Sequence, residues 1–120
     1  MSVEHLIDNL TNEVDGENGA DENIIIFTLS TCMWCKKCKS FLNDRNMKYR
    51  FIEVDKIDIK DKSSILNHLR SKYESRISYP FLVCKSGHVV GYNPNQYEEL
   101  FKKWGDLNGY GNKRRNERIY

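Results

Sequence analysis

The stretch Ile24-Ile25-Ile26-Phe27-Thr28-Leu29-Ser30-Thr31-Cys32-Met33-Trp34-Cys35 decides how this chain is expected to fold. Its first half, residues 24–29, is a short apolar run typical of a buried strand. The residues that follow, Lys36 to Leu42, have the basic and apolar spacing of a helix start. Two cysteines separated by two residues, between a strand and a helix, indicate a site of thiol–disulfide exchange.

The predicted helix start makes Cys32 the candidate nucleophile. Free backbone N–H groups and the helix dipole stabilise an anion at a helix N-terminus, and the thiolate is the reactive form of cysteine. Lys36 and Lys37 are expected to add to this stabilisation. We expect Cys32 to attack a substrate disulfide and form a mixed disulfide, which Cys35, one helical turn later and less exposed, then resolves. No bound cofactor is needed, because the redox-active group is the Cys32–Cys35 pair itself.

The rest of the chain predicts a small α/β domain. We expect a short helix over residues 3–10, strands over residues 24–29, 49–54, 81–84 and 88–91, and helices over residues 33–46, 63–74 and from Asn93 to Gly105. A helix between the first two strands implies a parallel pair, and the Ser86-Gly87 turn implies an antiparallel pair. The prediction is a four-stranded mixed sheet flanked by helices.

Charge divides the chain into three parts. Residues 1–23 contain seven acidic and no basic side chains, and the Asn-, Asp- and Gly-rich stretch over 11–23 predicts a flexible linker. Residues 24–105, with fifteen basic and eight acidic side chains, form the predicted domain. Residues 106–120, with four basic and two acidic side chains, predict a flexible tail. A basic domain favours acidic protein partners, although a solvated lysine-rich surface accounts for the charge equally well, and nucleic acid is not expected.

The composition also predicts where the chain works. No apolar run is long enough to cross a membrane, and the acidic start lacks the apolar core of a signal peptide. We therefore expect a cytoplasmic, monomeric protein with no membrane partner. In that reducing compartment the four cysteines indicate redox or metal chemistry rather than structural disulfides.

Three motifs together resemble the glutaredoxin branch of the thioredoxin fold. They are Ser30-Thr31-Cys32-Met33-Trp34-Cys35, Ser78-Tyr79-Pro80, and the segment from Gly87 to Gly91. The resemblance implies a thioredoxin/glutaredoxin fold, a cis bond between Tyr79 and Pro80 beside the dithiol, and substrate pairing with the backbone of Tyr79. The substrate-binding positions expected on this basis, with Trp34, Tyr79 and Tyr92 as a hydrophobic docking patch, are Thr31, Met33, Trp34, Tyr79, Pro80, Gly91 and Tyr92. The implied partners are disulfide-containing proteins and a reductase that supplies electrons.

Several residues differ from the pattern of glutathione-dependent glutaredoxins. Leu29 occupies the position of a lysine that binds a glutathione carboxylate in that family, and Ser78-Tyr79-Pro80 replaces Thr-Val-Pro. Gly91-Tyr92-Asn93-Pro94 replaces a glycine pair followed by aspartate. The pattern is more similar to glutaredoxin-like proteins of archaea and anaerobic bacteria, often reduced by a dedicated reductase. A glutathione-dependent glutaredoxin stays the alternative within this class.

The remaining cysteines leave other functions open. Cys38 extends the motif to Cys-x-x-Cys-x-x-Cys, so Cys32, Cys35 and Cys38 could hold a metal or an iron–sulfur cluster if another chain supplied a ligand. A fourth ligand in the usual spacing would fall on Leu42, and Cys38 is expected instead to face the core. Cys84 is predicted to be a buried thiol. A non-catalytic interaction module is a third possibility, suggested by the basic domain and by both charged ends of the chain.

Overall fold

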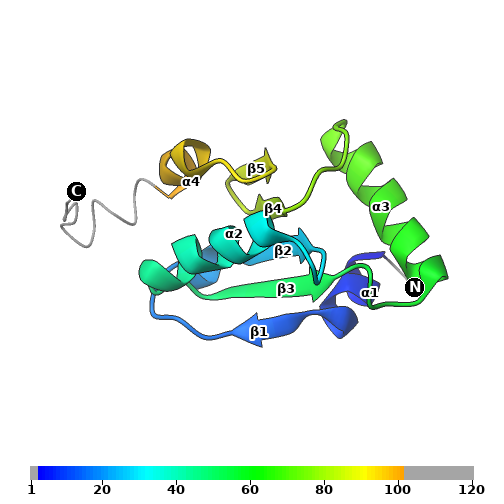
Figure 1. The fold of residues 1–120 in the computed structure, drawn as a ribbon, viewed down its shortest axis with the longest axis horizontal. Helices are drawn as coiled ribbons and strands as arrows, with labels where there is room; N and C mark the ends of the chain where they lie inside the picture. Colours follow the sequence, from blue (N-terminus) through cyan, green and yellow to red (C-terminus); the bar gives the residue numbers. More distant parts are fainter. Residues whose placement is uncertain (1–2, 102–120) are drawn as a thin grey trace.

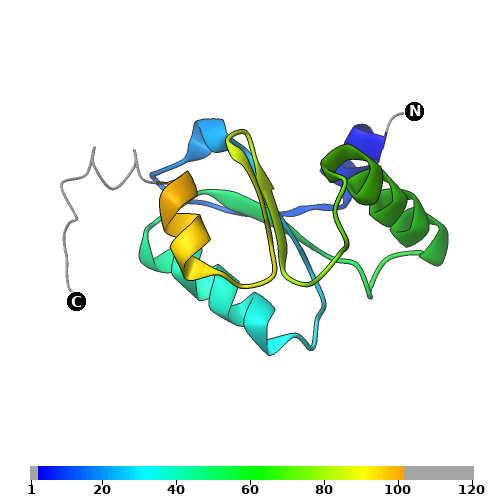
Figure 2. The same ribbon diagram turned by 90° about the horizontal axis from the view of Figure 1, so that it is seen from above.

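The fold is built around a mixed five-stranded sheet, seen in a computed structural model that describes residues 3–101. The strands lie in the order β1-β3-β2-β4-β5 (Figure 1). Helices cover both faces of the sheet, with α2 and α4 on one side and α1 and α3 on the other (Figure 2). In chain order the elements are α1 (Val3–Leu10), β1 (Asn12–Val14), η1 (Ala20–Glu22), β2 (Ile24–Thr28), α2 (Met33–Asp44), β3 (Tyr49–Glu53), α3 (Ile59–Tyr73), β4 (Phe81–Cys84), β5 (Gly87–Val90) and α4 (Pro94–Leu100).

Strand β2 is the centre of the sheet. It pairs in parallel with β3, where Ile24 lies opposite Tyr49, and antiparallel with β4, where Phe27 lies opposite Phe81. All five of its residues are buried, because helices cover both of its faces. The one polar side chain, Thr28, satisfies its hydroxyl by donating a hydrogen bond to the carbonyl oxygen of Ile52 at 3.1 Å. The site that follows Thr28 is therefore anchored in the most buried strand.

Alternation along the strands separates two hydrophobic clusters, one on each face of the sheet. One cluster joins alternate strand residues to α2 and α4, and its buried members are Ile24, Ile26, Cys38, Phe41, Leu42, Met47, Tyr49, Leu82, Val89, Tyr97 and Phe101. The other joins the remaining strand residues to α1 and α3, and its buried members are Ile7, Ile25, Phe27, Ile52, Val54, Ile65, Leu69, Phe81 and Val83. Both helical layers are thus held to the sheet by apolar side chains.

The sheet has one strand more than the four predicted. The additional strand, β1, pairs antiparallel with β3 and lies in the stretch over residues 11–23 that was predicted to be a flexible linker. Instead, these residues form β1 and η1. Val14 packs against the core of the α2 face, and the carboxylate of Glu22 is buried against Ser86. The linker prediction was wrong because strands pair through backbone N–H and C=O groups. The polarity of the side chains therefore does not show whether a segment pairs.

The other predicted boundaries need smaller corrections. Helix α3 begins at Ile59 rather than residue 63, because the polar run after Asp58 is compatible with a helix although it lacks an apolar face. Helix α2 ends at Asp44, and β5 spans Gly87–Val90. The predicted end of the last helix at Gly105 and the predicted tail over residues 106–120 lie outside the described residues. None of the helices described between residues 3 and 101 has the length and apolar character needed to cross a membrane.

Candidate active site

Cys32 stands at the N-cap of α2, where the sequence placed it. Its backbone is extended, and its sulfur accepts a hydrogen bond from the backbone N–H of Cys35 at 3.1 Å. An N-cap side chain satisfies one of the backbone donors that a helix start leaves free. The same donor and the positive end of the helix dipole favour a negative charge on this sulfur. The geometry therefore suits a thiolate at Cys32.

Cys35 differs from Cys32 in its surroundings. Cys32 is partly exposed, whereas the side chain of Cys35 is only 1% exposed. Burial, together with the hydrogen bond with the Cys32 side chain, raises the pKa of the Cys35 thiol to about 12. All four cysteines are free thiols in this structure. The pair thus consists of an accessible sulfur and a buried sulfur that keeps its proton at neutral pH.

The loop before β4 brings a backbone carbonyl to the dithiol. The peptide bond between Tyr79 and Pro80 is cis, as predicted. The carbonyl oxygen of Tyr79 lies 4.0 Å from the sulfur of Cys32 and accepts a hydrogen bond from its thiol. Pro80 is buried, and its carbonyl oxygen accepts a hydrogen bond from the backbone N–H of Gly91 at 2.8 Å. Gly91 has a φ of 79°, a conformation that glycine adopts without steric penalty.

The predicted docking patch is present in part. The rings of Trp34 and Tyr92 are stacked with their centroids 5.8 Å apart. Met33 and Trp34 are 67% and 55% exposed, and Thr31 is exposed beside them. Tyr79 is half-buried and, among residues 3–101, makes no ring contact with Trp34 or Tyr92. The exposed apolar surface beside Cys32 is therefore made by Met33, Trp34 and Tyr92.

Asp55 supports the loop before the dithiol, a role that the sequence analysis did not assign. Its carboxylate accepts hydrogen bonds from the backbone N–H of Ser30 at 2.9 Å and from the hydroxyl of Ser30. These bonds lower the pKa of the Asp55 carboxyl, with the side-chain bond to Ser30 making the largest contribution. Because β2 and β3 are parallel, the residues that follow them lie at the same edge of the sheet. A polar residue following β3 could therefore have indicated a contact with the loop after β2.

Tyr97 is a second residue that the sequence analysis missed. It is fully buried in α4, and its hydroxyl donates a hydrogen bond to the carbonyl oxygen of Gly91 at 2.9 Å. Burial raises its pKa, as does the nearby thiol of Cys38. The sequence could have indicated this role, because Tyr97 lies on the inward-facing side of the last predicted helix and a buried phenol needs a hydrogen-bond partner.

Cys38 faces the core, as predicted, and its side chain is fully buried. Burial raises the pKa of its thiol to about 11, although a hydrogen bond with Tyr97 and the charge of Lys39 act in the opposite direction. Within residues 3–101, no group of three or more His, Cys, Asp or Glu side chains is arranged to hold a metal ion. The predicted alternative of a metal site at Cys32, Cys35 and Cys38 has no support from the described residues.

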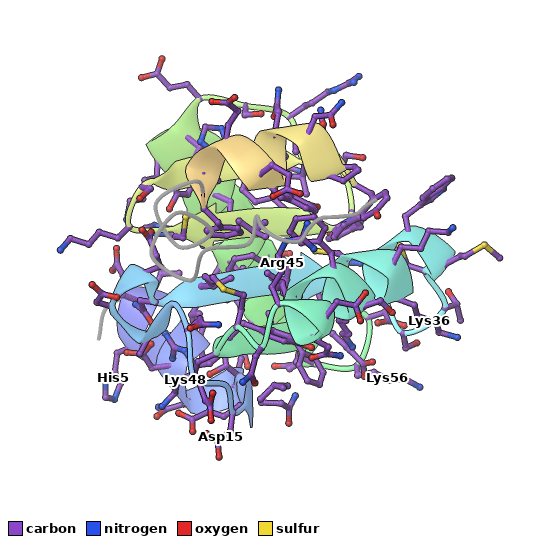
Figure 3. The ribbon with its side chains drawn as sticks, turned by 90° about the vertical axis from the view of Figure 1, so that its left-hand side faces the viewer. His5, Asp15, Lys36, Arg45, Lys48 and Lys56 are labelled. Carbon is purple, nitrogen blue, oxygen red and sulfur yellow. The ribbon has the colours of Figure 1, made fainter. Side chains whose placement is uncertain are left out.

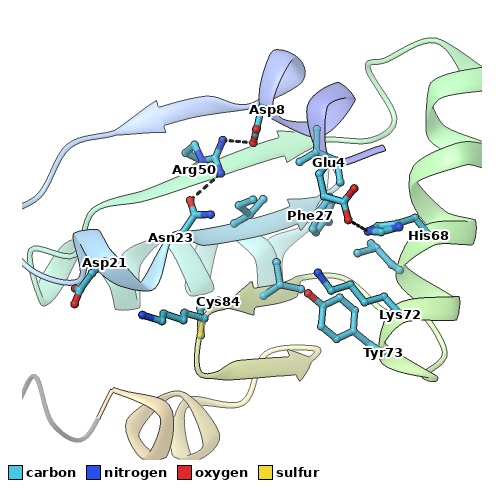
Figure 4. Close-up of a pocket in the computed structure, with 15 residues that line it drawn as sticks. Glu4, Asp8, Asp21, Asn23, Phe27, Arg50, His68, Lys72, Tyr73 and Cys84 are labelled. Carbon is cyan, nitrogen blue, oxygen red and sulfur yellow. Dashed lines mark hydrogen bonds and ion pairs between the residues drawn. The ribbon is translucent and has the colours of Figure 1, made fainter. Parts of the chain in front are cut away.

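Cys84 is less buried than predicted. It is the last residue of β4, next to the turn into β5, and its side chain is partly exposed. It lies in the wall of a pocket of about 430 Å³ between the sheet, α1 and α3 (Figure 4). An ion pair between Arg50 and Asp8 at 2.9 Å ties α1 to the sheet across this pocket, and a contact between the His68 imidazole and the Glu4 carboxylate at 3.3 Å ties α1 to α3. The pocket does not include the dithiol.

Comparison with known proteins identifies the family. The model of the Glutaredoxin family matches residues 24–89, more than half of the chain. The chain belongs to the glutaredoxin family. This glutaredoxin is 28% identical over 80 residues to a glutaredoxin-like 8.6 kDa protein in a rubredoxin operon of Clostridium pasteurianum, covering 67% of this chain and 99% of the relative. It is 29% identical over 68 residues to glutaredoxin 1 of Rickettsia conorii, with 57% of this chain matched but only 63% of that protein's length.

This glutaredoxin is similar to solved structures of archaeal members of the family. The glutaredoxin of Methanosarcina mazei superposes with a TM-score of 0.65 at 27% identity, covering 74% of this chain and 84% of that one. Methanoredoxin of Methanosarcina acetivorans superposes with a TM-score of 0.60 at 27% identity, covering 67% and 84%. The family and the fold support a thiol–disulfide oxidoreductase in general terms. Glutaredoxins act on disulfide or glutathione substrates.

Proposed function

We propose that this glutaredoxin reduces protein disulfides through the dithiol Cys32 and Cys35. The observation that carries the proposal is the difference between the two sulfurs. Cys32 is accessible and accepts the N–H of Cys35 at 3.1 Å, whereas Cys35 is buried and its pKa is raised. An accessible stabilised thiolate suits attack, and a buried thiol suits resolution, because it cannot meet a second substrate.

The reaction balances in two exchanges. The Cys32 thiolate attacks one sulfur of the substrate disulfide, forming a mixed disulfide and releasing the other substrate sulfur as a thiolate, which takes a proton from solvent. Cys35 then loses its proton and attacks the Cys32 sulfur, which releases the second substrate thiolate. The substrate gains two electrons and two protons, and the protein keeps the Cys32–Cys35 disulfide. A two-electron donor restores the dithiol.

We infer that this donor is a reductase rather than glutathione alone. Leu29 is partly buried against the cluster on the α1 and α3 face, so no cation stands at that position to bind a glutathione carboxylate. A purified chain whose dithiol is regenerated efficiently by glutathione would instead identify it as a glutathione-dependent glutaredoxin. The reducing cytoplasm and a monomeric state remain predictions that accompany this proposal.

Trapping of the mixed disulfide tests the proposed roles. Cys35→Ser removes the resolving sulfur and leaves Cys32 at the helix start, so this variant should accumulate a covalent complex with a disulfide substrate that dithiothreitol releases. Cys32→Ser should form no such complex and should lose disulfide reduction. Cys84→Ser is the matched control and should behave as the unmodified chain. Full activity of Cys32→Ser would show that the roles are assigned wrongly.

A further inference from the structure

Large exposed hydrophobic side chains gather beside Cys32. Three large hydrophobic side chains are exposed within residues 3–101, and two of them, Met33 and Trp34, separate the two cysteines. The third is Ile59, at the start of α3. Trp34 stacks on Tyr92, so residues from α2 and from the loop before α4 form one continuous face. Clustered exposed apolar side chains mark a contact surface for a partner.

Positive charge borders this apolar face. Lys36 and Lys37 are exposed on the first two turns of α2, and the ammonium group of Lys37 lies 5.5 Å from the centre of the Trp34 ring. Neither lysine takes part in the ion pairs of the described residues. Figure 3 shows Lys36 on α2, apart from Lys48, which lies between the end of α2 and the start of β3. Asp55, the carboxylate that supports the loop before Cys32, already accepts two hydrogen bonds from Ser30.

We propose that Met33, Trp34 and Tyr92, with Lys36 and Lys37, bind the substrate segment and select its class. That class is a protein disulfide flanked by an apolar or aromatic side chain and by carboxylate side chains. The apolar side chain covers the exposed face of Met33 and Trp34, and the carboxylates meet the two lysines. Opposite charges on two partners raise the rate at which they meet and fix their register. This inference rests on the proposed function and names its substrate class.

Single-turnover reduction of three disulfides tests the selectivity. The reduced full-length chain is mixed with a disulfide peptide carrying one Phe and two Glu, with the same peptide carrying two Lys in place of Glu, and with bis(2-hydroxyethyl) disulfide. We expect the Glu peptide to react about tenfold faster than the Lys peptide at low ionic strength. This ratio should approach one in about 0.5 M NaCl, because salt screens exposed charges.

Charge-matched variants locate the effect. Lys36→Gln/Lys37→Gln should bring the ratio of the two rates close to one, whereas Lys48→Gln/Lys85→Gln, which changes the net charge equally at the opposite edge of the sheet, should preserve it. Using a ratio cancels changes in the intrinsic reactivity of Cys32. The apolar half is tested by Trp34→Ala, which should reduce the preference for a Phe-bearing Glu peptide over a Gly-bearing one by several-fold.

The outcomes separate this inference from the proposed function. If bis(2-hydroxyethyl) disulfide and both peptides remain unreduced, the proposed function fails. If all three are reduced but the Glu and Lys peptides react equally fast, or if the control variant abolishes the ratio as well, the substrate class is wrong while the function stands. The proposed substrate class would also be wrong if the chain formed a concentration-dependent dimer that the Lys36→Gln/Lys37→Gln substitutions dissociate. The surface beside Cys32 would then bind the acidic segment of a second copy of the chain.

Discussion

The hydroxyl of Tyr97 donates a hydrogen bond to the carbonyl oxygen of Gly91 at 2.9 Å, which connects α4 to the active-site loops. The backbone N–H of Gly91 in turn donates to the carbonyl oxygen of Pro80 at 2.8 Å. Pro80 follows Tyr79, whose carbonyl oxygen faces the sulfur of Cys32. A buried phenol therefore holds the loop that faces the nucleophile, although it does not touch the reacting atoms.

Removing this hydroxyl should destabilise the fold and loosen the loop. Tyr97→Phe keeps the ring and deletes the bonds to Gly91 and Cys38, so we expect the free energy of unfolding to fall by about 1–2 kcal/mol in a urea titration. The rate of mixed-disulfide formation at Cys32 should also fall. Tyr73→Phe, in which no described hydrogen bond is lost, serves as control and should change stability by less than about 0.5 kcal/mol. Equal stability of the two variants would contradict this role.

The four cysteines should differ in their reaction with iodoacetamide. Cys32 is accessible at the helix start, whereas Cys35 and Cys38 are buried and their pKa values are raised to about 12 and about 11. The pKa of Cys84 is also raised by burial. At about pH 7.5 the native reduced chain should therefore take up one label quickly, at Cys32, because thiols react as thiolates. Mass spectrometry of the labelled peptides measures the rate of labelling at each cysteine. Rapid labelling of Cys35 would contradict its burial.

Alkaline pH should weaken the fold through Cys38. An unfolded cysteine loses its proton near its ordinary pKa of 9.0, whereas folded Cys38 keeps its proton up to a pKa of about 11. Between these values the unfolded chain binds fewer protons, so the free energy of unfolding falls as the pH rises, by at most about 1.4 kcal/mol per pH unit for this thiol. The stabilisation is fully present below pH 9.

Cys38→Ala should flatten this dependence. Urea titrations at about pH 8 and about pH 10.5 should show a smaller loss of stability in the variant than in the unmodified chain, because one of the buried thiols no longer titrates. Val89→Ala also shortens a buried side chain of the same cluster without removing a titrating group, and it should keep the original pH dependence. A Cys38→Ala slope identical to that of the unmodified chain would show that Cys38 does not contribute.

Glu22 should stabilise the fold, although it lies in the acidic N-terminal segment. Its carboxylate is 1% exposed and accepts hydrogen bonds from the backbone N–H of Ser86 at 3.0 Å and from the Ser86 hydroxyl at 2.7 Å. Glu22→Ala should lower the free energy of unfolding by about 2–3 kcal/mol, because it removes both hydrogen bonds that Ser86 donates to the buried carboxylate, and hydrogen bonds to a charged group are the stronger ones. Ser86→Ala should cost less.

Glu17→Ala is the matched control for Glu22→Ala, since Glu17 is an exposed glutamate of the same segment. It should change the free energy of unfolding by less than about 0.5 kcal/mol. If Glu22→Ala has no larger effect than Glu17→Ala, residues 11–23 behave as the flexible linker that their composition predicts.

Much of the site could be predicted because its signals are local. The strand over β2, the dithiol at the start of α2 and the turn before Gly87 each depend on residues that are close in sequence. The cis bond at Pro80 followed from the resemblance to glutaredoxins. By contrast, the hydrogen bonds between Ser30 and Asp55 connect residues 25 positions apart, and no periodic pattern in the sequence predicts them.

The sequence by itself determined that two cysteines sit between a buried strand and a helix, because the spacing of apolar and polar side chains dictates both elements. The sequence also predicted that Cys35 is the less exposed sulfur, but only the tertiary structure decided how deeply it is buried and which group faces Cys32. Cys35 is buried and the carbonyl oxygen of Tyr79 reaches Cys32 across 47 residues because β4 pairs with β2. The pairing of β1 with β3 was decided in the same way. Burial and backbone pairing depend on segments that meet only when the chain folds, so they leave no local pattern to read.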